Sequence, residues 1–285
     1  MGYHSRPEEY GTAVAALPFS LTHQVPLVWL GGLPIAVIDR ARSAHLMLEL
    51  ALSRRGTGTP PLYITSANGQ VLSICARDEA IRAAFLSADV IHADGTPLVL
   101  ASRLKSPLRL PERVATTDLF HDVAVQAEQR GATFYLLGGT PDVIARAVQR
   151  TRERYPRLKI AGFRGGYFSA AEEDRVIAEI NAARPDVLWI GMGVPAEQYF
   201  SARNRAKLTG VGVIKTSGGL FDFVSGKNSR APRWMQAAGL EWAYRMALEP
   251  RRLAYRYLTT NPHALYLLLM ARTSGDRAPL FERRG

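Results

Sequence analysis

The stretch TFYLLGGTPDVIARAVQRTRERY, residues 133–155, carries the pattern that decides the fold. Residues 133–137 read as a buried strand, two glycines follow, and residues 142–155 show helical periodicity. The same order recurs along the chain. We expect strands at 27–30, 62–65, 90–92, 133–137, 159–163, 187–190 and 211–215, and helices at 40–54, 117–130, 142–155, 170–183 and 196–208. Because the strands are continuous apolar runs that alternate with helices, we predict a doubly wound, mainly parallel, Rossmann-like α/β sheet.

The alternation stops near residue 223, and only helical patterns follow. We expect these helices at 231–248, 251–260 and 263–272. No clear strand or helix pattern precedes residue 26. We therefore divide the chain into a weakly structured lead-in (1–25), an α/β core (26–225) and a helical appendage (226–285).

Positive charge is concentrated in the appendage. The 285 residues carry 36 Lys and Arg against 25 Asp and Glu, a net charge of +11. Residues 226–285 hold 11 basic and 4 acidic residues, which gives 11 − 4 = +7. Such a segment implies an anionic partner: nucleic acid, a phosphorylated ligand or an anionic membrane surface. The chain has no RRM, KH or helix-turn-helix signature, so nucleic acid is disfavoured.

Neither a membrane span nor a secretory leader is predicted. Residues 10–38 lack Asp, Glu, Lys and Arg, but prolines and glycines interrupt this run, and the start of the chain lacks the pattern of a signal peptide. The single cysteine, Cys75, has no intramolecular disulfide partner and lies between apolar residues. We expect a reducing compartment, a buried thiol and peripheral membrane association at most.

Small-residue loops follow five of the predicted strands, at 64–69, 92–97, 137–142, 190–195 and 216–222. In parallel sheets, ligands bind beyond the carboxyl ends of the strands, where such loops open helices. Glycine at one such junction is often needed only for the turn, whereas five junctions on one edge favour a binding site. The GxGxxG and Walker patterns are missing, which disfavours a dinucleotide dehydrogenase and a P-loop ATPase.

Asp94 is the best candidate for a general base, because it follows an apolar strand and precedes Gly95 at this edge. The alternative is a helix cap. Asp222, which follows Gly218-Gly219, could orient a substrate or cap a turn. Arg113 is a candidate clamp for a diphosphate, or else the partner of Glu112 in a surface ion pair. We expect no metal site, since the chain lacks HExxH and CxxC spacings and any Asp-x-Asp pair.

A long ordered set of motifs lies near the end of the chain: GGLFDFVSGK at 218–227, RAPRWMQ at 230–236, GLEWAYR at 239–245 and EPRR at 249–252. ADG at 93–95, LPERV at 110–114, Asp118-Leu119 and GYF at 166–168 accompany them. With these motifs the chain resembles the WecG/TagA/CpsF glycosyltransferases, glycosyltransferase family 26, over about residues 29–260.

The resemblance implies inverting transfer of a sugar from a UDP-sugar to a polyprenyl-diphosphate-linked sugar, in surface-polysaccharide or teichoic-acid assembly. It implies that the protein is peripheral on the cytoplasmic face of the bacterial inner membrane, that Asp94 is the general base, and that no metal or cofactor is needed. With the loops above, it gives a candidate substrate-binding set of Ser66, Asn68, Arg113, Gly138, Gly139, Gly193, Glu197, Gln198, Gly218, Gly219 and Asp222. For the lipid diphosphate and the membrane it gives Arg233, Arg245, Arg251, Arg252 and Arg256.

Three positions depart from the family pattern. Ser66 replaces the usual Thr, Glu197-Gln198 reverses the usual order of amide and acid, and Ala115-Thr116 replaces Thr-Gly. These departures leave the donor open among N-acetylmannosamine, glucose and related sugars. The alternative function is a non-catalytic subunit that binds a nucleotide sugar or serves as a scaffold. The pattern does not decide whether the protein self-associates.

Overall fold

A computed structural model describes residues 25–237, 239–270 and 275–276. The predicted lead-in lies outside these residues except for Val25, and so do the last two residues of the helix predicted at 263–272. The division of the chain at residue 226 stays a prediction.

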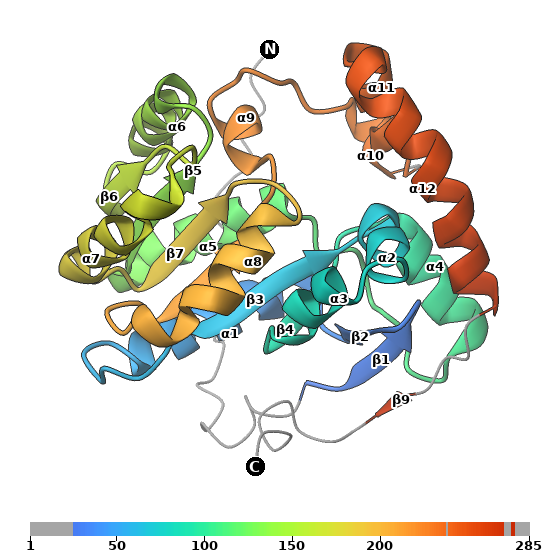
Figure 1. The fold of residues 1–285 in the computed structure, drawn as a ribbon, viewed down its shortest axis with the longest axis horizontal. Helices are drawn as coiled ribbons and strands as arrows, with labels where there is room; N and C mark the ends of the chain where they lie inside the picture. Colours follow the sequence, from blue (N-terminus) through green and yellow to red (C-terminus); the bar gives the residue numbers. More distant parts are fainter. Residues whose placement is uncertain (1–24, 238, 271–274, 277–285) are drawn as a thin grey trace, which may run out of the picture.

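A six-stranded parallel sheet forms the centre of the molecule, in the order β4-β3-β8-β7-β5-β6 (Figure 1). Its strands are β3 (Leu62–Ala67), β4 (Val90–Ala93), β5 (Thr133–Gly138), β6 (Lys159–Arg164), β7 (Val187–Gly191) and β8 (Val213–Thr216). The two halves of the sheet meet where β3 pairs with β8. The Rossmann-like parallel α/β fold predicted from the alternating pattern is confirmed.

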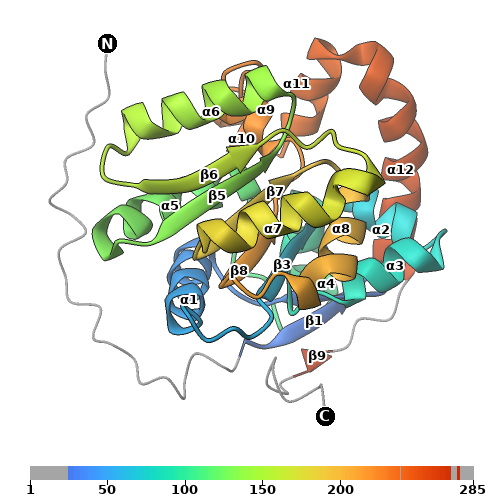
Figure 2. The ribbon, with the colours of Figure 1, turned by 60° about the vertical axis from the view of Figure 1, so that its left-hand side comes forward.

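Helices cover both faces of this sheet (Figure 2). The long helices of one face are α1 (Arg40–Ser53), α5 (Thr116–Arg130) and α6 (Pro141–Arg154), and those of the other are α7 (Glu173–Ala183) and α8 (Ala196–Asn204). Phe134 and Trp189 pack toward the first face, whereas Tyr135 and Leu188 pack toward the second. Neighbouring side chains of one strand thus enter opposite cores, which explains why the strand sequences are apolar throughout.

Four shorter helices of the core did not stand out in the sequence pattern: α2 (Gly69–Cys75), α3 (Glu79–Leu86), α4 (Thr96–Lys105) and α9 (Leu220–Val224). The predicted helix at 170–183 begins with a 3-10 turn at Ala170–Glu172, and the one at 196–208 ends with a 3-10 turn at Arg205–Lys207.

The first predicted strand does not join the parallel sheet. β1 (Leu27–Leu30) pairs antiparallel with β2 (Leu33–Ala36), which was not predicted, and with the two residues of β9 (Gly275–Asp276). Gly31 and Gly32, with φ of 56° and 85°, form the turn between β1 and β2. A two-residue turn with positive φ at both positions suits a tight antiparallel hairpin, so the local turn overrides the parallel arrangement expected for this strand.

In the described part of the chain, three helices follow the core: α10 (Arg233–Ala237), α11 (Glu241–Leu248) and α12 (Pro250–Met270). The helix predicted at 231–248 is therefore two helices. Gly239 separates them with φ of 72°, and a Cβ there would lie 3.0 Å from Thr96 Oγ1. The two helices predicted after residue 250 are one helix, which continues through Pro262. α12 packs on α2, with Ala264 against Gly69 and His263 beside Ser73 directly after the proline. This packing accounts for the continuity.

Within the described residues, no helix combines the length and the apolar composition that a bilayer span requires.

Candidate active site

Asp94 lies directly after β4, at the carboxyl edge of the sheet, and is partly buried. Its Oδ2 accepts hydrogen bonds from the backbone N of Thr116 at 3.3 Å and from Thr116 Oγ1 at 3.1 Å. Among the described residues, its Oδ1 accepts no hydrogen bond. The cap of the following helix α4 is Gly95, without a side-chain bond, so the structure does not support the alternative that Asp94 caps that helix.

Burial raises the pKa of Asp94, and four contributions oppose this rise: the Thr116 amide, the charges of Arg113 and Lys215, and the Thr116 hydroxyl. A partly buried carboxylate at the end of a strand, with opposing influences on its pKa, is a candidate general base. Two elements set the geometry of Asp94, the end of β4 and the first turn of α5.

The charge of Lys215 acts on this carboxylate, although the sequence did not single this residue out. It is fully buried in β8, and its Nζ donates to Ser66 Oγ at 2.8 Å and to the Thr216 carbonyl at 2.9 Å. Ser66 Oγ lies 3.2 Å from Thr116 Oγ1, which donates to Asp94. The presence of a lysine in a strand that is buried on both faces was the one sequence signal that could have identified this residue.

Glu197 and Gln198, at the start of α8, are both buried. The carboxylate of Glu197 accepts hydrogen bonds from the backbone N of Met192, Gly193 and Gly218, at 2.9 to 3.2 Å. Gln198 Nε2 donates to Glu197 Oε1 and to Thr65 Oγ1. Glu197 thus holds the loop at 192–193 and the loop at 218 together. Direct contact of Glu197 or Gln198 with substrate stays a prediction.

The predicted glycines divide into two groups. A Cβ on Gly138 would lie 2.2 Å from the Gly191 carbonyl oxygen, and the Gly139 amide donates to that same oxygen. The missing Cβ of Gly138 therefore lets β5 and β7 approach closely, whereas a Cβ on Gly139 would lie 3.0 Å from Val143 Cγ1 of α6. By contrast, a Cβ on Gly193 or Gly218 would meet no atom within 4 Å, and Gly219 is nearly as open. The open group borders space that a ligand can enter.

The backbone amides of three loop glycines are engaged within the protein. The backbone N of Gly139, Gly193 and Gly218 all donate to protein acceptors. Contact of these glycine loops with substrate stays a prediction.

Asn68 caps α2, where its Oδ1 accepts from the Val71 amide at 3.1 Å. A Cβ on Gly95 would lie 3.5 Å from the Asn68 Cβ, so the Asn68 side chain starts beside the Asp94-Gly95 turn. Asp222 lies in α9 and forms an ion pair with Lys227 at 3.0 Å. Within the described residues no group of three or more His, Cys, Asp or Glu side chains gathers in a way that could hold a metal ion.

The arrangement can now be compared with known proteins. A sequence model described as Glycosyl transferase WecG/TagA/CpsF family matches residues 28–278. The chain is also 32% identical over 208 residues to the N-acetylglucosaminyldiphosphoundecaprenol N-acetyl-beta-D-mannosaminyltransferase of Bacillus subtilis. The matched region covers 72% of this chain and 78% of that protein. The chain belongs to the WecG/TagA/CpsF glycosyltransferase family. The resemblance drawn from the sequence motifs is confirmed, and the protein is a glycosyltransferase by family.

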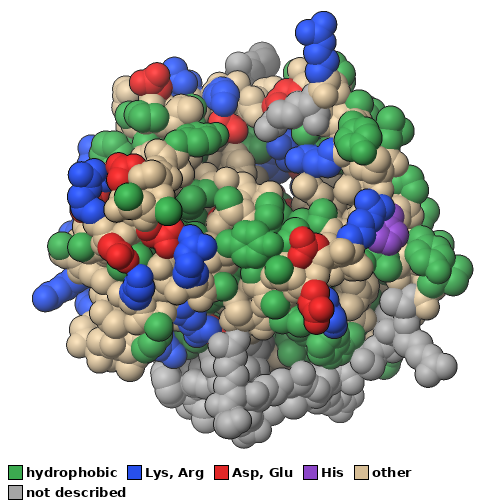
Figure 3. Space-filling model, viewed as in Figure 1, with side chains coloured by type: hydrophobic (Ala, Val, Ile, Leu, Met, Phe, Trp, Pro, Cys, Tyr) green, Lys and Arg blue, Asp and Glu red, His purple; other side chains and the backbone are tan. Residues whose placement is uncertain are grey.

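The helices at the end of this glycosyltransferase lie against its Asp94 edge. Gly239 packs on Thr96, two residues after Asp94, and Ala264 of α12 packs on Gly69, next to Asn68. His263 Nδ1 lies 2.9 Å from Ser73 Oγ of α2. Figure 3 shows a recess in the upper half of this face, between the core and the C-terminal helices. The Asp94 edge is therefore bordered by both parts of the chain.

Arg113 contacts the appendage rather than its neighbour Glu112. Its Nη1 lies 3.0 Å from Glu241 Oε2 in α11, whereas Glu112 accepts from the backbone N of Arg40. Glu241 also binds Arg230 Nε at 2.7 Å, and Arg230 reaches Asp118 of α5 at 2.9 Å. The surface pair between Arg113 and Glu112 that the sequence left open is not formed.

The arginines predicted for the lipid diphosphate lie on all three appendage helices. Arg245 stacks over the Phe223 ring at 5.3 Å, Arg256 over the Tyr257 ring at 4.9 Å, and Arg251 is exposed. The side chains of Arg233 and Arg252 lie outside the described part of the chain. Arg256 Nε is buried without a hydrogen-bond partner among the described residues.

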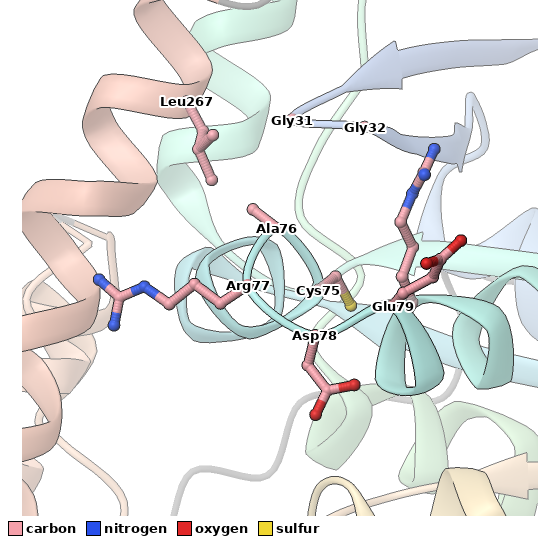
Figure 4. Close-up of a pocket in the computed structure, with 9 residues that line it drawn as sticks. Gly31, Gly32, Cys75, Ala76, Arg77, Asp78, Glu79 and Leu267 are labelled. Carbon is pink, nitrogen blue, oxygen red and sulfur yellow. The ribbon is translucent and has the colours of Figure 1, made fainter.

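A pocket of about 490 Å³ lies elsewhere, at the C-terminal end of α2 (Figure 4). The Gly31-Gly32 turn, residues 75–79, Arg82 and Leu267 line it. Asp78 caps α3, and none of the predicted site residues lines this pocket. We therefore place the candidate active site at Asp94 and not in this pocket.

Proposed function

We propose that this protein is an inverting glycosyltransferase that moves N-acetylmannosamine, glucose or a related sugar from a UDP-sugar to a polyprenyl-diphosphate-linked sugar. The observation that carries the proposal is Asp94, a carboxylate at the carboxyl edge of the parallel sheet with Oδ2 engaged by Thr116. Family membership supports the transfer, and the name of the Bacillus subtilis relative supports an acceptor of the diphosphoundecaprenol type. Such a reaction belongs to surface-polysaccharide or teichoic-acid assembly.

In the proposed step, Asp94 Oδ1 takes the proton from the acceptor hydroxyl. The hydroxyl oxygen forms a bond to the anomeric carbon of the donor as the bond from that carbon to the UDP phosphate oxygen breaks. UDP leaves with the bonding electron pair, and the anomeric configuration inverts. A carboxylate positioned in this way typically contributes about 10²- to 10⁴-fold to the rate.

Negative charge develops on the departing UDP, and cations stabilise it where water is excluded. We propose that Arg113 supplies this charge, and that the appendage arginines Arg233, Arg245, Arg251, Arg252 and Arg256 bind the lipid diphosphate and the membrane surface. The charge of Arg113 supports transfer without a metal ion.

The membrane surface is the further partner in this proposal. Tyr255 and Leu258 of α12 are 78% and 73% exposed, and Leu104 of α4 is 82% exposed. Lys105 Nζ donates to the carbonyls of Leu268 and Leu269, which joins α4 to the end of α12. Apolar side chains along the right-hand edge of Figure 3 lie over α12. Exposed apolar residues on a basic helical segment suit an anionic bilayer, so we propose peripheral binding at the cytoplasmic face of the bacterial inner membrane.

The test measures UDP release from a panel of UDP-sugars, with a synthetic lipid-diphosphate-linked sugar as acceptor and EDTA present. We expect acceptor-dependent release with one donor, and Asp94→Asn lowers kcat about 10²-fold or more. The matched control is Asp174→Asn, an 85% exposed carboxylate paired with Lys207, which leaves kcat unchanged.

Two outcomes contradict the proposal. Full activity of a folded Asp94→Asn variant removes the base. No release with any donor by a protein that still binds UDP-sugars favours a non-catalytic subunit.

A further inference from the structure

Lys215 is a fully buried charge that the proposed transfer step does not use. It lies on β8, where it is opposite Ile64 of β3. A buried ammonium is costly unless it is paired and hydrogen-bonded. Its Nζ has two acceptors, Ser66 Oγ and the Thr216 carbonyl, and both lie at the end of the sheet where Asp94 is held.

The donors in this cluster fix the direction of its hydrogen bonds. An ammonium only donates, so Ser66 Oγ accepts from Lys215. Thr116 Oγ1 donates its single hydrogen to Asp94 Oδ2. The bond of 3.2 Å between the two hydroxyls therefore has Ser66 as donor and Thr116 as acceptor. Each hydrogen points from Lys215 toward Asp94.

We propose that Lys215 is a positioning residue for glycosyl transfer, which acts through Ser66 and Thr116 to hold Asp94 as an ionised carboxylate with Oδ1 available. The inference rests on the proposed role of Asp94 as the base. A chain of hydroxyls that is polarised in one direction favours the ionised acceptor at its end. Lys215 itself is too deeply buried to serve as a surface contact.

The charged groups around Lys215 agree with this role. Burial lowers the pKa of Lys215 to about 8, and the negative charges of Asp94 and Glu197 oppose that decrease. Burial and the Lys215 charge together hold the pKa of His92 well below its usual range, so His92 stays neutral. Arg113 is the other cation that acts on Asp94. Lys215 is thus charged at neutral pH and faces two carboxylates.

The experiment compares pH profiles of kcat/KM for the full-length wild type, Lys215→Met and Lys215→Arg. Without the Lys215 charge the pKa of Asp94 rises, so the acidic limb of the Lys215→Met profile moves to higher pH. We expect kcat/KM at pH 6.5 to fall on the order of tenfold or more, mainly through kcat. Above pH 8, where wild-type Lys215 loses its own proton, the two profiles converge. Lys215→Arg restores the position of the limb.

The matched control is Lys207→Met, which removes a 55% exposed lysine that pairs with Asp174 and leaves the profile unchanged. An acidic limb that stays in place in folded Lys215→Met overturns the proposal, whatever the loss of activity.

A second pair of variants tests the hydroxyl chain without removing the buried charge. Thr116→Val interrupts the chain and moves the acidic limb to higher pH, whereas Thr116→Ser keeps the hydroxyl and leaves the limb in place. Equal profiles for these two variants overturn the proposal even where Lys215→Met does not fold. Failure of the proposed function is seen separately, as full activity in Asp94→Asn.

Discussion

At the scale of single residues, the buried Glu197 shapes the candidate site by holding two of its loops together. Its two carboxylate oxygens receive backbone N–H groups from the loops at 192–193 and at 218. Burial raises the pKa of Glu197 to about 7, although the Gly218 amide, Gln198, Lys215 and the Gly193 amide all oppose the rise. The exchange of acid and amide at 197–198 therefore places the acid where two loops converge.

This raised pKa predicts a pH dependence of stability. A carboxyl group whose pKa is higher in the folded state stabilises the fold fully below its ordinary pKa of 4.5, and this contribution is lost as the pH rises through about 7. The free energy of unfolding should fall in that window, by on the order of 3 kcal/mol at most. Urea unfolding between pH 4.5 and 8 measures it.

Glu197→Gln does not titrate, so its free energy of unfolding should vary less over the same window. Glu153→Gln, a change at an exposed position of α6, serves as the control and keeps the wild-type slope. An equal slope in Glu197→Gln would show that another group causes the pH dependence.

At the scale of elements, local signals predicted the long helices well, because their start and stop residues lie in the sequence. Thr140 caps α6 and Pro141 begins it, and α5 ends at Gly131 in the left-handed conformation. Such local signals did not predict the helix boundaries of the appendage. Gly239 breaks a helical pattern where the chain passes Thr96, and Pro262 leaves a helix intact where α12 packs on α2. Both outcomes depend on contacts with distant segments.

Glu241 is the residue through which α11 is fixed to the core. It pairs with Arg113 and Arg230, and all three side chains are about one-fifth exposed. We expect Glu241→Gln to lower the free energy of unfolding by on the order of 1 kcal/mol. We also expect faster proteolysis in residues 226–232 and lower transfer activity, since α10 and α11 lie against the Asp94 edge.

The control for this variant is Glu179→Gln on α7, which also loses pairs with two arginines, Arg164 and Arg175. It should change neither the proteolysis near residue 230 nor the activity. Equal effects of the two variants would mean that Glu241 has no special part in holding α11.

At the scale of the whole molecule, the appendage packs against the core. The polar face of the site comes from the core loops, and α12 runs beside α2 with its outer apolar residues exposed (Figures 1 and 2). In the proposed reaction, a lipid-linked acceptor would meet these exposed apolar and basic residues before it reaches Asp94. This arrangement leads to a prediction about membrane binding.

The double change Tyr255→Ser and Leu258→Ser removes exposed apolar area from α12 without entering the core. We expect binding to vesicles that contain anionic lipid to weaken about tenfold or more, as measured by vesicle sedimentation. UDP release with a short, water-soluble acceptor should be unchanged. Val125→Ser, a 44% exposed position on α5, is the control. If the double variant still binds vesicles but sedimentation shows that a dimer is lost, this face binds a second copy of the chain and not the membrane.

The alternation of strands and helices, the family and the candidate base Asp94 could all be predicted from the sequence, because apolar periodicity, caps and loop motifs are local properties of the chain. Other features became apparent only in the folded molecule: β1 leaves the parallel sheet, Arg113 pairs with Glu241, and Lys215, Ser66 and Thr116 form a single hydrogen-bonded chain to Asp94. These residues lie up to 149 positions apart. Their contacts form only when the sheet brings separate strand ends to one edge, and no local pattern records that meeting.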